Sequence, residues 1–537
     1  MSFAFNNKVR KLRKLITRYD ATSNAGKLAA LQDLSAIGLA SSPSLVGYAD
    51  LLQFVQAFPP ERKTLRAAEK ELARIRRFLA RPQNRSSKSL INSGLPHTPY
   101  VSKFSHDLCN WLAHDPACRM QVERFEDPEF DLNKVLAITL PSLERSETTS
   151  GFGNQELLDT LKVPRERELQ FLLAELQKLD HSPRIKDLLF DGLGLYVRIL
   201  PKNKSFSRIF NRIPTKSPFF HDGILKAFDH RLLMEQPLCA PVALDRPSRE
   251  IVIRAVKLSM VLTDRETDPT TYLDEHTFRL YDLERGISVA IYGMVPSRQL
   301  PMESYIGYTL FKNGFPAAYG GGWVFGRRAD FGINIFEAFR GGESGYMLCQ
   351  LLRVFRQVFG VAHFEIEPYQ FGLDNPDGIA TGAFWFYHRY GFRPKDKALL
   401  LLSEQEVAKR KARKNHRTSN RVLLRFTKSN MALMLSGEHQ PGVYDITALV
   451  KRMIRVSYKG DRARAENESV KKFQARTGCA VVPDTFGAQV LKEVALWAEA
   501  TKQSDPEKLD LLVRMIGTKP GDPYQYQELL LQYFRKS

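Results

Sequence analysis

The chain has 537 residues, 43% of them hydrophobic and 26% charged, which is typical of a globular protein and too long for a single core. It contains no apolar run of about 18 residues or more, which argues against a membrane-spanning helix. The formal net charge of +20 favours acidic partners, such as nucleic acid, anionic lipid headgroups, phosphorylated cofactors or an acidic carrier protein, without choosing among them.

The first half of the chain is predicted to be mainly helical. Amphipathic spacing in AGKLAALQDLSAIGLA, LVGYADLLQFVQAF and ERKTLRAAEKELARIRRFLA indicates a helical N-terminal region over residues 1–90. A polar connector with Pro and Gly lies at 81–99. Residues 100–245 are expected to form a second, mostly helical region with one strand in GLGLYVRILP.

Residues 246–400 are predicted to be a separate α/β domain. The stretch SYIGYTLFKNGFPAAYGGGWVFG places Asn313-Gly314 between two strand-like runs, a strong signal for a hairpin. FGINIFEAF adds a third strand, the apolar spacing after RGGESG predicts a helix that Gly360 ends, and AHFEIEPYQF is a further strand. The strand–helix–strand crossover makes the last two strands parallel.

Residues 401–537 are predicted to be first basic and then helical. The expected fold class is therefore α/β, with a central mixed sheet and its helices flanked by mainly α-helical N- and C-terminal regions. We find no internal repeat that would change this division.

The glycine-rich break RGGESG lies between the first parallel strand and the helix. A helix start leaves backbone N–H groups unpaired and carries partial positive charge, so glycines there let a phosphate come close to the amides. Arg340 at the strand end would add a charge-assisted contact. A tight turn that needs glycine φ angles is the alternative explanation.

The order of these elements, followed by GAFWFYHRYGFRP at 382–394, resembles the GCN5-related N-acetyltransferase (GNAT) superfamily over about residues 280–395. Arg340 and Gly345 match the first and last positions of the family's Q/R-x-x-G-x-G/A loop. The later pattern A-x-x-x-Y-x-x-x-G-F is reproduced by Ala383, Tyr387, Gly391 and Phe392. Two positions depart from the family: Glu343 replaces the middle glycine of the loop, and Ala380 replaces a frequent asparagine.

The resemblance implies acyl-CoA as the donor substrate, and it implies that Tyr387 protonates the departing thiolate. The two departures would suit an altered donor, such as an acyl group on a carrier protein or on tRNA, or a domain that has lost its cofactor. The residues expected to hold the donor phosphates are Arg340, Gly341, Gly342, Ser344, Gly345 and Tyr346.

Acyl transfer to an amine also needs a base. Alternation along AHFEIEPYQF puts His363, Glu365 and Glu367 on one face of their strand. Glu337 shares a face of the preceding strand with two isoleucines, where burial would raise its pKa. Glu337, Glu365 and Glu367 are therefore candidate bases or binders of the substrate amine, with an ion pair or solvation at a strand end as the alternative for each.

Two further features of this region have both a functional and a structural interpretation. Asp374, Asn375 and Asp377 lie in a loop after a strand end, where sites are often built, although a bare turn with Asn-Pro and Asp-Gly is the favoured interpretation. The aromatic cluster in GAFWFYHRY would suit an acyl pocket or a core.

The densest basic run of the chain, at 406–426, follows directly. Such runs are usually solvated helix faces, and the functional alternative is a surface for tRNA, an acidic carrier protein or coenzyme phosphates. Its cations are Lys409, Arg410, Lys411, Arg413, Lys414 and Arg417, with Arg421 and Arg425 after them.

These patterns predict a cytoplasmic acyltransferase that moves an acyl group from acyl-CoA or an acyl carrier protein to an amine. The five scattered cysteines fit free thiols in a reducing compartment, and the spacing of His106, Cys109, His114 and Cys118 matches no common zinc site, so no metal is expected. One alternative is a transferase that uses aminoacyl-tRNA, and another is a non-catalytic GNAT-like protein that binds nucleic acid or a partner.

Overall fold

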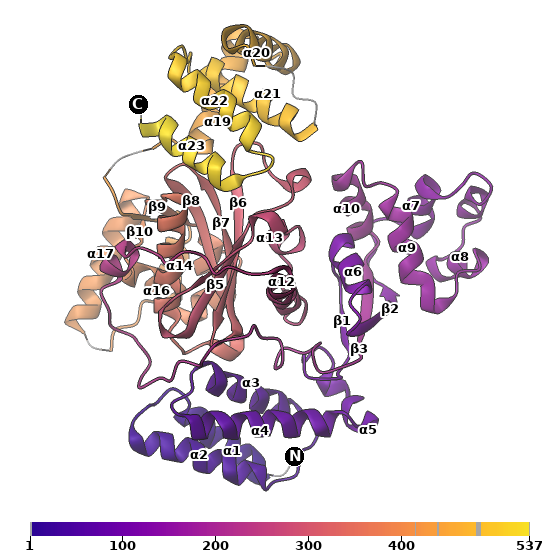
Figure 1. Ribbon diagram of the computed structural model, residues 1–537, viewed down its shortest axis with the longest axis vertical. Helices are drawn as coiled ribbons and strands as arrows, with labels where there is room; N and C mark the ends of the chain where they lie inside the picture. The colour runs from indigo at the N-terminus through magenta and orange to yellow at the C-terminus, as the bar shows by residue number, and fades with distance from the viewer. Residues whose placement is uncertain (1–2, 414, 438–439, 480–484, 536–537) are drawn as a thin grey trace.

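The computed structural model describes residues 3–413, 415–437, 440–479 and 485–535 (Figure 1). The fold is mixed α/β, with an eight-stranded sheet at its centre, helical parts above and below it in this view, and a smaller α/β part beside it. No helix within the described ranges is long and apolar enough to cross a bilayer.

The N-terminal helices form a bundle below the sheet in Figure 1. Asp20 begins the second helix by accepting a hydrogen bond from the Ser23 N–H. Leu52 and Phe58 belong to the same buried core as Leu348 of the sheet part, so the bundle is packed as a continuation of the sheet part. The helices are α1 (Phe3–Leu15), α2 (Ala21–Ser35), α3 (Pro43–Ala57), α4 (Arg62–Leu79) and α5 (Pro82–Arg85).

The part beside the sheet has a core of its own and a small antiparallel sheet in the order β1-β3-β2. Of its strands, β3 is the one that the sequence predicts in GLGLYVRILP. Its strands are β1 (Tyr100–Ser102), β2 (Cys118–Phe125) and β3 (Leu195–Pro201). Its helices are α6 (His106–Ala113), α7 (Leu132–Thr139), α8 (Asn154–Thr160), α9 (Glu168–Gln177) and α10 (Pro183–Gly192).

The central sheet has the strand order β10-β11-β9-β8-β7-β6-β5-β4. The hairpin between β6 and β7 turns at Asn313 and Gly314, which both have positive φ, as the predicted turn requires. All its strand pairs are antiparallel except β8 with β9. The strands are β4 (Arg279–Asp282), β5 (Ile287–Tyr292), β6 (Ser304–Lys312), β7 (Phe315–Phe325), β8 (Arg328–Ile335), β9 (His363–Ile366), β10 (Arg393–Pro394) and β11 (Met431–Met434).

The strand β8 pairs with the parallel strand β9 only at its beginning. Their register runs from Arg328↔His363 to Asp330↔Glu365, whereas β8 continues to Ile335. Residues 331–335 of β8 therefore have no partner on β9, and the two strands part. The crossover between them is α14 (Ser344–Phe359), which Gly360 ends in the left-handed conformation.

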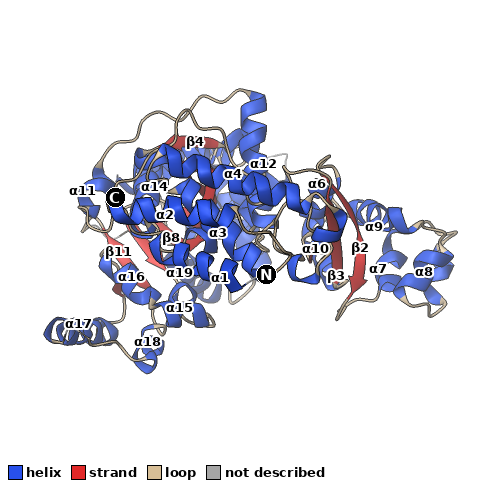
Figure 2. Cartoon of the chain, turned by 90° about the horizontal axis from the view of Figure 1, so that it is seen from below, coloured by secondary structure: helices blue, strands red, loops and turns tan. Residues whose placement is uncertain are grey.

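The remaining helices surround this sheet. The helices α11 (His230–Glu235), α12 (Arg246–Val261) and α13 (Asp268–Thr271) precede the strands of the sheet in the chain. The strand β9 is followed by the 3₁₀ turn η8 (Pro368–Phe371), α15 (Pro376–Thr381) and α16 (Ala383–Arg389). The next two helices, α17 (Lys397–Ala412) and α18 (Asn420–Phe426), stand out from the rest of the molecule (Figure 2).

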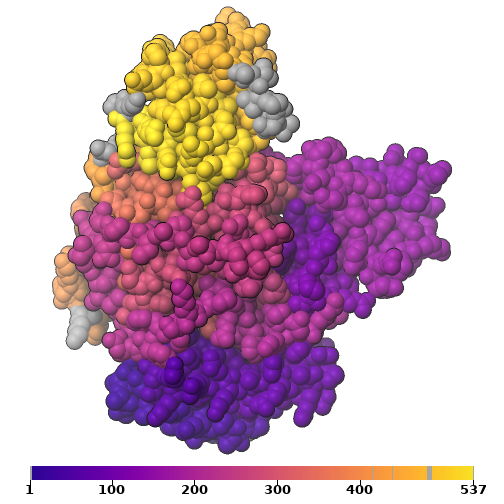
Figure 3. All heavy atoms as spheres, in the orientation of Figure 1, coloured from indigo at the N-terminus to yellow at the C-terminus, as the bar shows by residue number. Residues whose placement is uncertain are grey.

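The C-terminal helices pack around Trp497 in a separate core and form the top lobe in Figure 3. Gln527 of the last helix reaches the sheet, because its side chain donates to the carbonyl oxygens of Gly326 and Phe359 and accepts from the Gly326 N–H. The helices are α19 (Val443–Ser457), α20 (Arg462–Thr477), α21 (Thr485–Ala500), α22 (Pro506–Thr518) and α23 (Pro523–Arg535).

Candidate functional site

A cavity of about 890 Å³ lies where β8 and β9 part. One wall comes from the end of β8, the loop that follows it, η8, α15 and α16. The opposite wall comes from the N-terminal bundle, the connector, the loop after β3 and the segment before α13, through residues such as Asp50, Gln53, Ser93, Arg208 and Glu266. The cavity is thus enclosed by segments that are far apart in the sequence.

Tyr387 on α16 is the most enclosed polar group of this cavity. Its side chain is buried, and its phenol accepts a hydrogen bond from the Ile333 N–H, which lies in the unpaired part of β8, and donates to Gln370 Oε1 at 3.4 Å. Burial raises the pKa of Tyr387 well above its usual value. The phenol is therefore protonated and faces the gap between the strands, where it can give a proton to an anion.

The glycine-rich loop has a structural explanation for several of its glycines. Gly341 has positive φ, a Cβ on Gly342 would meet the Phe58 ring at 2.5 Å, and a Cβ on Gly345 would lie 1.6 Å from the Tyr390 hydroxyl. These glycines and Tyr346, which accepts from Gln350, are not part of the cavity wall.

Arg340 and Ser344 of the same loop do line the cavity. Arg340 is exposed, and no ion pair links it to any residue that the structure describes. Its guanidinium is therefore available to an anionic ligand at the mouth of the cavity.

Glu343, the residue that departs from the family loop, turns away from the cavity. Its buried carboxylate accepts from Arg285 at 2.6 Å, from Lys312 at 2.7 Å and from the Leu225 N–H at 3.1 Å. Burial alone would raise the pKa of Glu343, but the hydrogen bonds from Arg285 and the charge of Lys312 hold it below its ordinary value. The carboxylate therefore fixes the loop from behind and leaves the cavity open.

The three predicted glutamates have different surroundings. Glu337 lines the cavity, but it is exposed and lies in a 3₁₀ turn, since β8 already ends at Ile335. Glu367 is exposed at the end of β9 and lies outside the cavity.

Glu365 is buried in an ion cluster on β9. It accepts from Lys395 at 2.8 Å, from His363 at 3.0 Å and from Arg328. Burial alone would raise the pKa of Glu365, but the hydrogen bonds from His363 and Lys395 lower it to about 2. Glu365 and its three partners thus bind one another, and none of the four lines the cavity.

Some residues of the loop and of the aromatic cluster after β9 line the cavity, and others do not. Asn375 begins α15 by accepting from the Gly378 N–H, and both Asn375 and Asp377 line the cavity. Phe386 also lines it, whereas the Phe384 ring stacks on Phe426 at 3.9 Å and belongs to the core.

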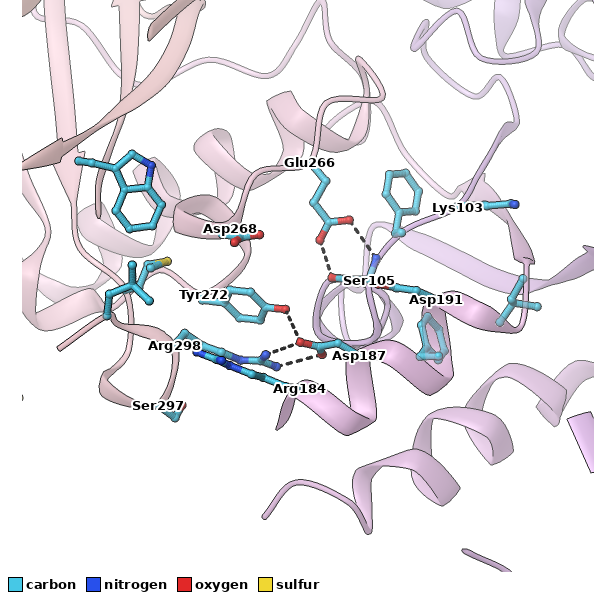
Figure 4. Close-up of a pocket in the computed structure, with 16 residues that line it drawn as sticks. Lys103, Ser105, Arg184, Asp187, Asp191, Glu266, Asp268, Tyr272, Ser297 and Arg298 are labelled. Atoms are coloured by element: carbon cyan, nitrogen blue, oxygen red, sulfur yellow. Dashed lines mark hydrogen bonds and ion pairs between the residues drawn. The ribbon is translucent and has the colours of Figure 1, made fainter. Parts of the chain in front are cut away.

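No sequence pattern points to Glu266, which lines this cavity and also a second cavity of about 570 Å³ (Figure 4). Its carboxylate accepts from the Ser105 N–H at 2.9 Å, from the Ser105 hydroxyl and from the Thr271 hydroxyl at 2.6 Å. Ser105 and Glu266 are 161 residues apart, so no local pattern could have connected them.

The second cavity lies between α10 and the segments around α13. Figure 4 shows Arg298 and Tyr272 directed at Asp187, while Glu266 turns to Ser105. Partial burial, and then the negative charges of Asp187 and Glu266, raise the pKa of Asp191 to about 6.

Of the remaining predictions, Lys409, Arg410, Lys411, Arg413 and Arg417 are exposed on or just after α17, and Lys414 lies outside the described residues. Within the described part of the chain, no three His, Cys, Asp or Glu side chains gather so that they could hold a metal ion. No family model, no curated protein and no solved structure matches the chain.

Proposed function

We propose that the chain is an acyltransferase that moves an acyl group from a thioester donor, acyl-CoA or an acyl carrier protein, to an amine, in the cavity between β8 and β9. The observation that carries the proposal is that the buried, protonated Tyr387 lines the same cavity as Arg340 and Ser344. The GNAT-like order of hairpin, strand, loop, helix and strand supports the same chemistry.

In this proposal the donor phosphates meet Arg340 and the loop, and the thioester lies in the gap between the strands. The amine attacks the thioester carbonyl, so that a C–N bond forms and the C–S bond breaks. The thiolate that leaves takes the Tyr387 proton, because a protonated phenol next to a developing anion acts as a general acid.

The attacking nitrogen must lose a proton, and the cavity wall offers two carboxylates for this step. Glu337 stands at the exposed lip, and Glu266 stands at the junction with the second cavity. We propose Glu266 as the base for an amine that enters from the second cavity, since Ser105 and Thr271 hold its carboxylate in place. Glu337 is the alternative for an amine that enters from the lip.

The test is to incubate the purified protein with a series of acyl-CoAs and amines and to measure turnover through the release of the free thiol. Tyr387→Phe keeps the buried ring but removes the proton donor, so kcat should fall about 100-fold or more. Tyr390→Phe is the matched control, because that ring covers Gly345 outside the cavity wall. Wild-type thiol release by the Tyr387→Phe protein would exclude the proposed acid.

A further inference from the structure

The segment 407–437 concentrates positive charge without any compensating acid. It contains no Asp or Glu and nine Lys or Arg residues. We call the end of α17, the described part of the turn and α18, residues 407–413 and 415–428, the basic arm; in Figure 2 these two helices extend away from the body. A protruding surface of one charge attracts a polyanion from solution.

The cations of the basic arm are largely free. Lys409 pairs with Glu406 at 2.8 Å, and Arg410 lies over the Trp385 ring at 4.4 Å. The exposed cations for which the described residues provide no acidic partner are Lys411, Arg413, Arg417, Arg421, Arg425 and Lys428. An anionic ligand would meet these groups without displacing an internal ion pair.

The basic arm is also held in a fixed shape. Buried Glu406 accepts from Lys409 and from His416 at 3.1 Å, and this joins α17 to the turn. Burial alone would raise the pKa of Glu406, but the hydrogen bonds from Lys409 and His416 lower it to about 2, so the carboxylate stays charged. The Phe426 ring, stacked on Phe384, fixes α18 to α16.

Arginines recur in the sequence of this segment in a row of three at a spacing of four. Arg421 and Arg425 lie on one face of α18, about 6 Å apart along its axis, and Arg417 precedes them just before the helix. Arginine forks suit phosphate groups, to which they donate two parallel hydrogen bonds. The row therefore fits a chain of phosphates better than a single anion.

The surface offers little to a partner that needs apolar contact. Among the large apolar residues of α17 and α18, the exposed ones are Leu401 and Leu424, at 56% and 51%. A membrane or an acidic protein would bury a larger apolar patch at the centre of its interface. Phosphate contacts need none.

We propose that the basic arm binds the phosphate backbone of a folded RNA. The arm lies behind the cavity, since α18 packs against α15 and Arg410 covers Trp385 on α16, and both α15 and α16 carry cavity residues. The choice of RNA over DNA rests on an extension of the proposed function, in which the same transferase takes an acyl ester in place of the thioester, because the nucleic acid that carries such an ester at its end is RNA. The binding itself does not depend on turnover.

The test is fluorescence anisotropy of a labelled, transcribed tRNA with the full chain at about 50 to 200 mM salt. Arg417→Gln, Arg421→Gln and Arg425→Gln together should weaken binding at least tenfold at the lower salt and reduce the slope of log Kd against log salt by about 2 to 3. Melting temperatures should stay unchanged, because the three side chains are exposed.

The matched control is Lys451→Gln, Arg452→Gln and Arg455→Gln on α19, which removes the same charge from exposed positions elsewhere. It should leave the affinity within about twofold, since separated charges are screened at these salt concentrations. An equal loss in both triple variants would overturn the proposal, as would stronger binding to duplex DNA of the same length or equal competition by polyglutamate. Thiol release is measured separately, so RNA binding and acyl transfer can fail independently of each other.

Discussion

At the scale of single residues, the buried carboxylates of this protein act as fixed charges. Glu365 and Glu343 each accept hydrogen bonds from two or more cationic side chains, and both are almost fully buried. Breaking such a cluster leaves its cations unpaired in the interior, which costs more than the pair itself contributes.

Glu365 makes a pH-dependent contribution to stability. Its pKa falls from 4.5 to about 2 on folding, so the contribution, on the order of 3 kcal/mol, is complete above pH 4.5 and is lost as the pH falls toward 2. Glu365→Gln should therefore be less stable than wild type at pH 7, and the difference should vanish over this acidic range in urea unfolding. Glu367→Gln, one residue beyond the end of the same strand and exposed, should not alter the acidic limb. A constant difference at every pH would contradict this assignment.

At the scale of elements, the start of α14 depends on close packing. Gly345 leaves no room for a Cβ beside the Tyr390 ring, whereas Gly517 in α22 has open space around its Cα. Gly345→Ala should destabilise the protein by about 1 to 3 kcal/mol, because Tyr390 must shift. Gly517→Ala should stabilise it by up to about 1 kcal/mol, because alanine loses less entropy in a helix. Thermal unfolding of the two variants checks the opposite signs, and equal shifts would show that the packing at 345 is loose.

Local patterns were sufficient for some elements and not for others. The hairpin at Asn313-Gly314, the helix that Gly360 ends and the parallel pair around it all follow from turn chemistry and apolar spacing. The strands β1 and β2 fell in a stretch with helical signals, and β11 lies beyond residue 400, in a range expected to be helical. Pairing partners far away in the sequence decide such strands, because β-propensity depends on the neighbours.

The candidate site shows the same limit. Tyr387, Arg340 and Ser344 were predicted from a motif or from the loop inside it, and all three line the cavity, whereas Arg208 and Glu266 became visible only in the folded chain. Glu337 was predicted on β8 by extending the alternation of that strand, but β8 ends at Ile335. Phe336 still donates to the Ala317 carbonyl oxygen of β7, but Pro316, the next residue of β7 along the pair, has no N–H to donate, so the pairing cannot continue.

At the scale of the whole molecule, Arg208 joins three parts that enclose the cavity. Its guanidinium donates to Asp50 and to Gln53 on α3 and to the Ser93 carbonyl oxygen in the connector at 2.7 Å. The N-terminal bundle therefore keeps its place over the cavity partly through this one side chain.

Arg208→Met should loosen the bundle while preserving much of the side-chain volume. We expect a loss of about 2 to 4 kcal/mol and faster proteolysis in the connector at 81–99, because Asp50 loses its partner. Limited proteolysis and thermal unfolding measure both effects. Arg212→Met, an exposed change in the same segment, is the control and should stay within about 0.5 kcal/mol. Identical digestion of the two variants would contradict a joining role for Arg208.

The contact of Gln527 with the turn after β7 has a consequence for synthesis on the ribosome. The side chain that binds the Gly326 amide and carbonyl lies 201 residues further along the chain. At a rate of synthesis of roughly 5 to 20 residues per second, it is made on the order of 10 to 40 s after Gly326. Until then the growing chain carries an unfinished end of its sheet, which a chaperone could occupy. The hairpin of β6 and β7 can therefore close long before the turn that follows it gains its partner on α23.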